Sequence, residues 1–410
     1  LYLLSYSYRG IGDYENALII MNEVEGLVKA NDYSLSKIQI SKGSLFLLSG
    51  YYGEAEKLYK SGLESAKKFG NKKEEAKALI NLAILDDQNG NVDEAKNKLK
   101  TSIQISEAIE DKEIEATALS ELAVSYTYSG NVVEAKNNYE KSYEIFKELN
   151  HKERLSNLCA NIAALYSQTG NYSAALSNYN KGFDYAGENV VSKILNIRGL
   201  GDVYSNLSNY SKSLEYYEQA KELATQVKDI QTETSVDVSI GTLYYNINKP
   251  IKALQVFLDA KEKIDVDADP YLGEDVLFKV GLAYSSIDSL QNADKAFNNA
   301  LSIAESLNDI YYKTIITSEL GYNSYLQNDL NKAQSYISKA LSLAKENSLN
   351  QLAGVQNLYL GKVAFAKNNL SSALNYFSSA SLIAEQEMDY NNVFESEYYF
   401  AKTLIKLNKT

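Results

Sequence analysis

The chain has 410 residues, of which 45% are hydrophobic, 23% are charged and 11% are aromatic. This hydrophobic content supports a large core and excludes a chain that is disordered throughout. The net charge of −12 repels phosphate backbones, so we expect no direct binding of nucleic acid by this region. The single cysteine, Cys159, excludes an internal disulfide and any metal site built from several cysteines.

No apolar run approaches the ~20 residues that a membrane-spanning helix needs, so we expect no membrane contact by this region. The first ten residues lack the charged start and the small-residue cleavage site of a signal peptide. The chain also begins without Met and partway into a repeat, which predicts that it is a piece of a longer or processed protein. Its compartment, cytoplasmic or periplasmic, would follow from the flanking sequence.

A turn residue recurs along the chain at spacings of 38 or 40 residues. The positions are Gly12, Gly50, Gly90, Gly130, Gly170, Ser208, Asn248, Asp288, Asn328, Asn368 and Asn408. All are Gly, Asn, Asp or Ser, residue types that tolerate a left-handed backbone or supply local hydrogen bonds. Repetition at this period predicts a repeat architecture rather than a set of unrelated domains.

After each turn comes the pattern of an amphipathic helix. In the repeat that turns at Gly170, Ala175 is followed by Tyr179 and then by Gly182, and other repeats keep this order of small, large and small residues. Spacings of four and three residues put all of them on one helical face.

Before each turn lies a second helical pattern, in which a small residue stands seven positions ahead of the turn. Leu200, Gly201 and Tyr204 illustrate it: a large residue precedes the small one, and an aromatic residue follows three positions later. Small residues allow two helices to approach closely, and large residues fill the spaces beside them. Each repeat is therefore predicted to be a helix, a tight turn and an antiparallel helix.

The predicted fold is all-α: a right-handed α-solenoid of about ten antiparallel helix pairs, forming one array over residues 1–410. Its expected repeats are 1–33, 34–73, 74–113, 114–153, 154–191, 192–231, 232–271, 272–311, 312–351, 352–391 and a partial repeat at 392–410.

This pattern resembles the tetratricopeptide repeat, which has large-x-x-Leu-Gly-x-x-Tyr in its first helix and Ala-x-x-x-Phe-x-x-Ala in its second. The stretch "NIRGLGDVYSNLSNYSKSLEYYEQA" follows it closely, with Leu200, Gly201, Tyr204, Tyr217 and Ala220 at the matching positions. The resemblance extends over the whole chain.

Two features depart from the family pattern. The period is 40 residues here, against about 34 in the family, and the proline that usually ends the second helix is absent. The only prolines, Pro250 and Pro270, are expected in a turn and in a connector. Without that proline, the second helix is predicted to run about one turn longer than in the family. Long repeats of this kind resemble those of kinesin light chains, bacterial Rap-type regulators and sensor regions of bacterial signalling proteins.

Candidate catalytic groups are few. His151, the only histidine, falls in a connector, and Cys159 takes a position that holds leucine in the two preceding repeats. We therefore expect Cys159 to be a buried core residue rather than a nucleophile.

Carboxylate pairs such as Asp86–Asp87 and Glu74–Glu75 are expected to be solvated helix faces. The pair Gly199-x-Gly201 follows no strand, so it is not a nucleotide-binding fingerprint. No metal-ligand spacing is present. The sequence thus predicts a non-enzymatic protein with no catalytic residues, no cofactor and no metal.

The resemblance implies a groove that is lined by the first helices, at positions three before and one, four and five after the small residue. The candidate groove residues are Ile80, Ile84, Gln88, Tyr128, Gln168, Arg198, Asp202, Asn206, Tyr245, Asn246, Phe278, Leu282, Tyr322 and Tyr325. Their mixed apolar and uncharged polar character favours an extended or helical peptide. The predicted hot spot is the group Asn206, Tyr245, Asn246, Phe278 and Leu282.

A clamp for a carboxylate tail would need Lys and Arg, together with Asn, at groove positions of consecutive repeats. Arg198 fits such a clamp, but Asp202 is placed one helical turn later, where it would neutralise the guanidinium. We therefore predict no clamp of this kind.

Two functional hypotheses follow. The first is a protein- or peptide-binding module that forms the sensor or interaction region of a larger bacterial signalling protein. The alternative is a structural scaffold or adaptor that holds partner proteins together without a defined peptide ligand. The pattern makes no prediction about oligomeric state.

Overall fold

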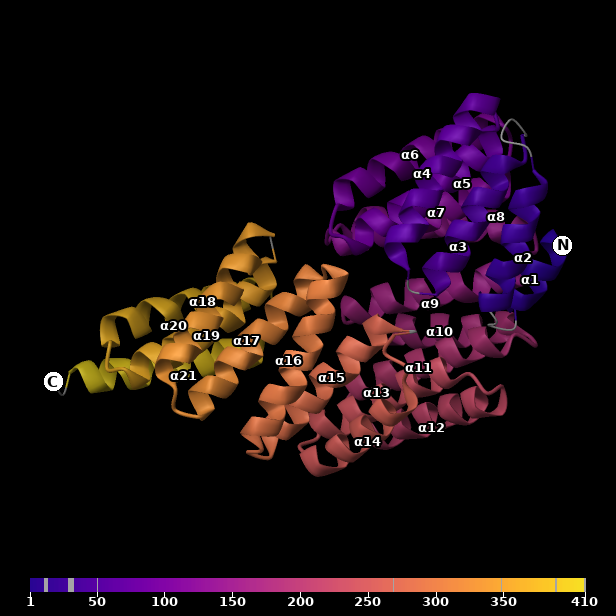
Figure 1. Ribbon diagram of the computed structural model, residues 1–410. Coiled ribbons are helices and arrows are strands. Elements are labelled where there is room, and N and C mark those ends of the chain that lie inside the picture. The colour runs from indigo at the N-terminus through magenta and orange to yellow at the C-terminus, as the bar shows by residue number, and fades with distance from the viewer. Residues whose placement is uncertain are drawn as a thin grey trace. The chain divides into compact units, whose positions relative to one another are not determined.

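The computed structural model describes residues 1–10, 14–28, 33–49, 51–267, 269–347, 349–387 and 389–408. Within these ranges the chain consists of α-helices joined by short turns, without a β-strand (Figure 1). The predicted all-α class is confirmed. The expected turn residues Gly12 and Gly50 lie outside the described ranges.

Contacts divide the chain into two compact units, Leu1–Val236 (unit 1) and Asp237–Thr410 (unit 2). The boundary falls within α13 (Ile230–Asn246), and the prediction of one continuous array stays a prediction. Unit 1 contains the helices α1 (Tyr2–Gly10), α2 (Tyr14–Leu27), α3 (Leu35–Leu48), α4 (Tyr52–Phe69), α5 (Lys72–Gln88), α6 (Val92–Ala108), α7 (Lys112–Tyr128), α8 (Val132–Glu148), α9 (Lys152–Gln168), α10 (Tyr172–Ala186), α11 (Val190–Asn206) and α12 (Tyr210–Gln226). Unit 2 contains α14 (Pro250–Lys263), α15 (Pro270–Ser286), α16 (Leu290–Leu307), α17 (Ile310–Leu326), α18 (Leu330–Glu346), α19 (Asn350–Ala366), α20 (Leu370–Gln386) and α21 (Tyr390–Leu407).

Each unit is a solenoid of helix pairs. The two helices of a repeat pack on each other, as α17 does on α18 and α19 on α20, and each second helix packs on the first helix that follows it. Successive first helices also touch, for example α5 with α7 and α17 with α19. No comparable contact joins successive second helices in the described part of the chain. The first helices therefore lie closer together, and they form what we call the inner face of each unit.

The turns inside the repeats have the backbone conformation that their residue types predict. Gly90, Gly130 and Gly170 have φ between 70° and 78°. The non-glycine residues at the same place in later repeats have φ between 57° and 62°; they are Ser208, Asn248, Asp288, Asn328 and Asn368. Asn408 differs, with φ −75° at the end of α21. A left-handed residue reverses the chain at once, which lets the second helix start within three residues.

The connectors between repeats use a second left-handed turn that the sequence pattern did not indicate. Glu110, Asn150 and Lys228 have φ of 57°, 51° and 57°. The N–H of Asp111, just after Glu110, donates to the carbonyl of Ser106 at 2.9 Å, which closes the end of α6. The residue at this position differs in type from repeat to repeat, so the sequence does not indicate the left-handed conformation there.

Both prolines stand at the first position of a helix, Pro250 in α14 and Pro270 in α15. A helix leaves its first N–H groups without internal partners, so the missing N–H of proline costs nothing there. Neither proline interrupts a second helix, and α6 and α8 each run for 17 residues.

The core of each repeat rests on a small residue that faces a large one. A Cβ atom added to Gly281 would lie 2.5 Å from Cδ1 of Phe297, and one added to Gly361 would lie 2.4 Å from Cε1 of Phe377. Both phenylalanines are completely buried. The predicted pairing of small and large residues is confirmed, because glycine is what admits the ring of the second helix.

The carboxylate pairs that were expected to be solvated are largely buried. Glu74 and Glu75 are only 5% and 7% exposed, and lysines at 3.1 Å and 2.8 Å neutralise them. Asp86 forms an ion pair with Lys98. The expectation of solvated faces was wrong because the first helices, where these pairs stand, are covered on both sides by second helices.

Unit 2 also buries a carboxyl group without a cation. Glu274 on α15 is fully buried, and neither of its carboxyl oxygens has a hydrogen-bond partner in the described ranges. Burial, together with the smaller effect of the neighbouring carboxylates of Asp309 and Asp275, raises the pKa of Glu274 from 4.5 to about 9. Glu274 is therefore protonated at neutral pH.

Substitution of Gly281 by valine tests the close approach of α15 and α16. Because the Phe297 ring is fully enclosed, we expect Gly281→Val to lower the free energy of unfolding by about 2 kcal/mol. Gly53→Val is the matched control, since no atom lies within 4 Å of a Cβ at Gly53. Urea denaturation followed by circular dichroism measures the free energy of unfolding of both variants. Equal losses in the two variants would contradict the close approach of α15 and α16 at Gly281.

Substitution of Glu274 by glutamine tests the buried acid. A carboxyl whose pKa is raised on folding contributes full stability below its unfolded pKa, and this stability is lost as pH rises toward the folded pKa. We therefore expect the stability of Glu274→Gln, relative to the native chain, to increase by at least ~1 kcal/mol between pH 5 and pH 8. Thermal melting across this range measures it, with the exposed Glu385→Gln as control. If the difference in stability between Glu274→Gln and the native chain does not change with pH, Glu274 does not have a raised pKa.

Candidate functional site

The inner face is the surface that the first helices leave accessible. Two predicted groove residues do not reach it. Ile80 is 5% exposed and packs with Ile114 and Leu122 of the next repeat, and Phe278 is 7% exposed and packs with Ile316. Both stand three positions before the small residue, and the structure assigns this position to the core between repeats. Their assignment to the groove was wrong.

The other predicted groove residues are accessible, and the two units divide them. Unit 1 carries half-buried Ile84 and Arg198 and exposed Gln88, Tyr128, Gln168, Asp202 and Asn206. Unit 2 carries half-buried Tyr245, Leu282, Tyr322 and Tyr325 and exposed Asn246. The predicted hot spot therefore loses Phe278 to the core and has Asn206 in a different unit from its remaining members.

Arg198 and Asp202 each have another partner. A guanidinium N–H of Arg198 donates to Oγ of Ser235 at 2.7 Å, and the hydroxyl of Tyr217 donates to Asp202 at 2.6 Å. No ion pair between Arg198 and Asp202 occurs in the described ranges. These two hydrogen bonds fix both side chains to neighbouring helices. They take the place of the expected ion pair between Arg198 and Asp202.

In unit 1 the inner face carries two half-buried carboxylates on α5 and α7. Burial raises the pKa of Asp87 to about 6, although a hydrogen bond from Ser125 opposes this rise. Burial raises the pKa of Glu121 to about 7, although the charge of Arg154 opposes it. Both groups titrate near neutral pH, and the adjoining Tyr128 is 65% exposed.

In unit 2 the inner face carries a group of tyrosines, here called the tyrosine cluster: Tyr245, Tyr322, Tyr325 and Tyr359. The ring centroids of Tyr322 and Tyr359 are 4.3 Å apart with an interplanar angle of 17°, and those of Tyr322 and Tyr325 are 5.8 Å apart. Burial raises the pKa of Tyr322 to about 12, with smaller contributions from neighbours that include Tyr245. The hydroxyl of Tyr322 therefore stays protonated and can donate hydrogen bonds.

A titratable carboxyl group lies next to this cluster. The hydroxyl of Tyr359 donates to Oε1 of Glu319 at 3.1 Å. Burial raises the pKa of Glu319 to about 7, while the hydrogen bond from Tyr359 and the charge of Lys362 lower it. Near neutral pH the Glu319 carboxyl exists in both protonation states, so it can accept or donate a hydrogen bond.

Lys362 is buried within the same region. Its side chain is 5% exposed, and Nζ lies 2.8 Å from Glu395 on α21. The ammonium also lies 5.0 Å from the ring centroid of Tyr322 and 5.5 Å from those of Tyr359 and Tyr399. The charge is thus satisfied by one carboxylate and three aromatic rings, which orders α17, α19 and α21 relative to one another.

Glu319 and Tyr359 were missed because one of the four predicted groove positions was placed one residue too early. Both stand two positions before the small residue, whereas the prediction took the residue three before it. The signal was present in the repeats: the buried position carries Ile40, Ile80, Val238 and Leu358, and the next position carries Asn81, Glu121 and Asn161. One residue turns a helix by about 100°, enough to move a side chain from the core to the surface.

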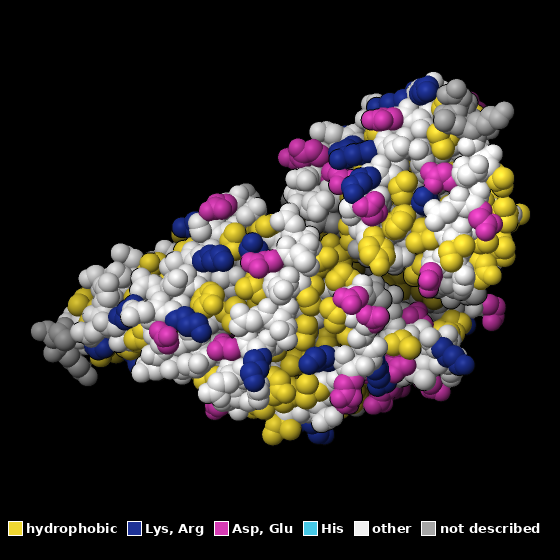
Figure 2. Space-filling model, in the orientation of Figure 1, with side chains coloured by type: hydrophobic (Ala, Val, Ile, Leu, Met, Phe, Trp, Pro, Cys, Tyr) yellow, Lys and Arg dark blue, Asp and Glu magenta, His cyan; other side chains and the backbone are white. Residues whose placement is uncertain are grey.

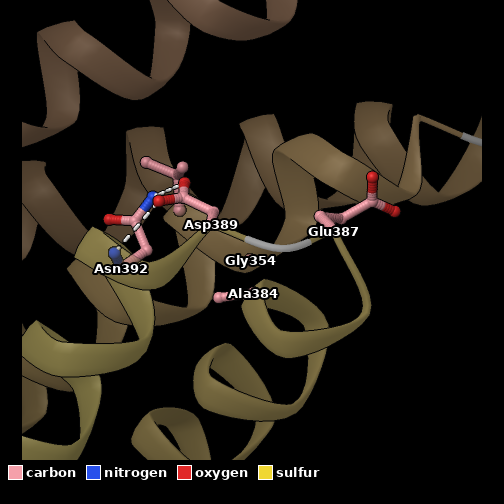
Figure 3. Close-up of a pocket in the computed structure, with 6 residues that line it drawn as sticks. Gly354, Ala384, Glu387, Asp389 and Asn392 are labelled. Carbon is pink, nitrogen blue, oxygen red and sulfur yellow. Dashed lines mark hydrogen bonds between the residues drawn. The ribbon is translucent and has the colours of Figure 1, made fainter. Parts of the chain in front are cut away.

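A small cleft lies elsewhere in unit 2, where α20 ends and α21 begins (Figure 3). It encloses about 240 Å³ and is lined by Gly354, Val355, Ala384, Glu387, Asp389 and Asn392. Asp389 accepts hydrogen bonds from the backbone and side-chain nitrogens of Asn392, so it caps α21. The cleft is smaller than most ligand pockets, which enclose roughly 300–1,000 Å³. We assign it a structural role.

The remaining candidates for chemistry are accounted for. Cys159 is fully buried, and burial raises the pKa of its thiol to about 11, as a core residue requires. His151 stands just before α9 and packs edge-on against Phe146. The described residues contain no grouping of three or more His, Cys, Asp or Glu side chains suited to a metal ion.

The surface carries charges of both signs. On the face shown in Figure 2, Lys and Arg side chains are interspersed with Asp and Glu side chains. In the described ranges, no helix combines the length and apolar character needed to cross a membrane.

Comparison with known proteins gives matches in family models and in solved structures. Two models of the tetratricopeptide repeat match residues 114–186 and 199–226. No curated protein matches the chain. A Rap protein complexed with Competence and Sporulation Factor is similar in structure, with 13% identity, a TM-score of 0.57, and 87% of this chain and 99% of that chain covered.

Two further structures are similar. Aspartyl phosphate phosphatase F from Bacillus subtilis has 16% identity and a TM-score of 0.53, with 83% of this chain and 91% of that chain covered. A signal transduction ATPase with numerous domains, from Pyrococcus horikoshii, has a tetratricopeptide repeat sensor. It shows 19% identity and a TM-score of 0.53, with 84% of this chain covered. This chain spans only 55% of the Pyrococcus protein.

The fold defines a class, the solenoids of antiparallel helix pairs. Within that class, residues 114–186 and 199–226 match models of the tetratricopeptide repeat, and the repeated small-and-large pattern of the helix pairs agrees with these matches. Repeats of this type stack into extended surfaces that serve as protein-interaction modules.

Substitution of Tyr359 by phenylalanine tests the electrostatics of the inner face. The Tyr359 hydroxyl stabilises the Glu319 carboxylate, so its removal is expected to raise the pKa of Glu319 above its present value of about 7. A ¹³C NMR titration of the glutamate carboxyl groups measures this, with Glu319→Gln identifying the signal. Tyr390→Phe, at a residue 75% exposed, is the control. An unchanged or lowered pKa of Glu319 in Tyr359→Phe would contradict the hydrogen bond between Tyr359 and Glu319.

Proposed function

We propose that this chain is a non-catalytic module that binds a peptide or an extended protein segment on its inner face. The observation that supports this most is the tyrosine cluster of unit 2. Its rings are half-buried, which leaves part of each accessible, and Tyr322 and Tyr359 are held in place by stacking. Aromatic residues on rigid elements dominate the free energy of binding at many protein interfaces.

The chemistry of the cluster fits a peptide. Protonated phenols and the Glu319 carboxyl offer donors and acceptors to backbone amides, while the ring faces offer apolar contact. Asn246 and Leu282, both accessible in unit 2, add an amide and an aliphatic group to the same inner face.

We further propose that the module is the sensor or interaction region of a larger signalling protein. Support comes from two similar structures: the Rap protein was solved with Competence and Sporulation Factor, and the Pyrococcus protein has a repeat sensor. At identities of 13% and 19% these likenesses show the fold, and the signalling role is carried over as a proposal.

The alternative, a scaffold or adaptor, is favoured by one observation. Some second helices expose large apolar side chains, such as Val133 at 68%, Ile251 at 74% and Leu382 at 59%. A scaffold would use these outer surfaces, whereas a peptide-binding module would use the tyrosine cluster. The two roles therefore predict different sensitive residues.

The double variant Tyr245→Ala/Tyr322→Ala tests the proposed function. Peptides selected from a random 12-residue library on the native chain are expected to bind the variant at least tenfold more weakly, a loss of ~1.4 kcal/mol. Leu382→Ala, on the outer surface, is the matched control and should bind normally. Fluorescence anisotropy measures affinity, and circular dichroism verifies folding. Undiminished binding by the double variant, or loss in Leu382→Ala alone, would favour the scaffold.

A further inference from the structure

Carboxyl groups bridge successive first helices of unit 2 on the inner face. The hydroxyl of Tyr312 on α17 donates to Asp275 on α15 at 2.7 Å, and the hydroxyl of Tyr359 on α19 donates to Glu319 on α17 at 3.1 Å. In the described part of the chain, successive second helices make no comparable contact. Contacts between the first helices are therefore among those that set the angle from one repeat to the next.

Glu319 bridges α17 and α19 without a cation of its own. Its carboxyl is half-buried, and in the described ranges no lysine or arginine forms an ion pair with it. The ammonium of Lys362, on the same helix as Tyr359, lies 2.8 Å from Glu395 on α21 instead. An ionised Glu319 therefore places a negative charge in a partly dry junction, and this costs free energy.

Two groups of α19 act on the protonation of Glu319. Burial raises the pKa of Glu319 to about 7, although the hydrogen bond from Tyr359 and the positive charge of Lys362 lower it. Tyr322 on α17 stacks on Tyr359 with the ring centroids 4.3 Å apart, which holds the Tyr359 ring in place. The carboxyl thus changes its charge near neutral pH at a fixed place between two helices.

Charged groups on the other helices that pack on α17 engage different partners. Asp275 on α15 accepts a tyrosine hydroxyl near the start of α17. Glu305 on α16 lies 3.7 Å from Nζ of Lys313, and Nζ of Lys332 on α18 lies 5.8 Å from the centroid of a tyrosine ring of its own helix. The protonation state of Glu319 therefore depends on its junction with α19.

We infer that the junction between α17 and α19 is a hinge, which protonation of Glu319 closes and ionisation of Glu319 opens. The neutral carboxyl remains in the junction, bonded to Tyr359. The ionised carboxyl gains hydration when α17 and α19 separate, because water then replaces the environment that disfavours its charge. This inference goes beyond the proposed function, since it concerns the shape of the inner face with no ligand bound.

The direction of the pH effect follows from linkage. Because the pKa of Glu319 is raised from 4.5 to about 7 in the closed junction, the closed form has its full advantage below pH 4.5 and loses it as pH rises through 7. Over this window the ratio of open to closed junctions is expected to increase by up to ~10²-fold.

Spin labels on the outer second helices measure the hinge. Asn299→Cys on α16 and Ser379→Cys on α20 are exposed and stand at the same position two repeats apart, on either side of the junction. Cys159 is fully buried and stays unlabelled. Opening the inner face brings the outer helices together, so pulsed electron paramagnetic resonance is expected to show their mean distance shortening by at least ~2 Å between pH 5 and pH 8.

Two variants and a second label pair make the test specific. Glu319→Gln keeps an acceptor for Tyr359 but does not titrate, so its distance is expected to stay constant with pH. Tyr359→Phe removes the hydrogen bond that lowers the pKa of Glu319, so its transition is expected at higher pH. The labels Asp259→Cys and Lys339→Cys, on α14 and α18, span the α15–α17 junction instead and should show no change.

Four outcomes overturn the inference. They are a native distance that does not change with pH, a change that persists in Glu319→Gln, an equal change in the α14–α18 pair, and a transition at unchanged or lower pH in Tyr359→Phe. Circular dichroism verifies that the labelled variants are folded. The labels report on the chain without a ligand, so failure of the hinge leaves the peptide-library test of the proposed function unaffected.

Discussion

The close approach of the two helices in each repeat is the constraint on which the rest of the structure depends. At Gly281 and Gly361 there is no room for even a methyl group beside the rings of Phe297 and Phe377. This contact sets the distance between the first and second helix of a repeat, and it recurs every 38 or 40 residues along the chain. A helix pair has an apolar face that it cannot bury alone, so the copies must stack.

Stacking brings the first helices together and thereby creates the inner face. Hydrogen bonds about 40 residues apart in sequence join them, such as Tyr359 to Glu319 and Tyr312 to Asp275. Burial raises the pKa of the Glu319 and Asp87 carboxyl groups on this face, and the hydrogen bonds that they accept only partly oppose this rise. The inner face is thus a structural interface, and it is also the surface on which we propose that a ligand binds.

Much of the fold was predictable. The turns, the order of small and large residues and the burial of Cys159 follow from residue types that each have one dominant physical use. The left-handed connectors at Glu110 and Lys228 were not predictable, because tertiary packing holds residues there that do not prefer the conformation. Likewise, Glu74 and Glu75 look solvated in a sequence, since nothing local shows that a neighbouring helix will cover them.

The candidate site, like the fold, was predictable from the sequence only in part. The sequence by itself determined the repeat, the helix pair, the face of each first helix that turns inward to within one residue, and the candidates Tyr245, Tyr322 and Tyr325. Only the tertiary structure decided that Ile80 and Phe278 belong to the core, that Tyr359 stacks on Tyr322, and that Glu395 neutralises Lys362. The physical reason is that a repeating pattern specifies the contacts every repeat shares, whereas charge pairing and ring stacking across helices depend on side chains that differ between repeats.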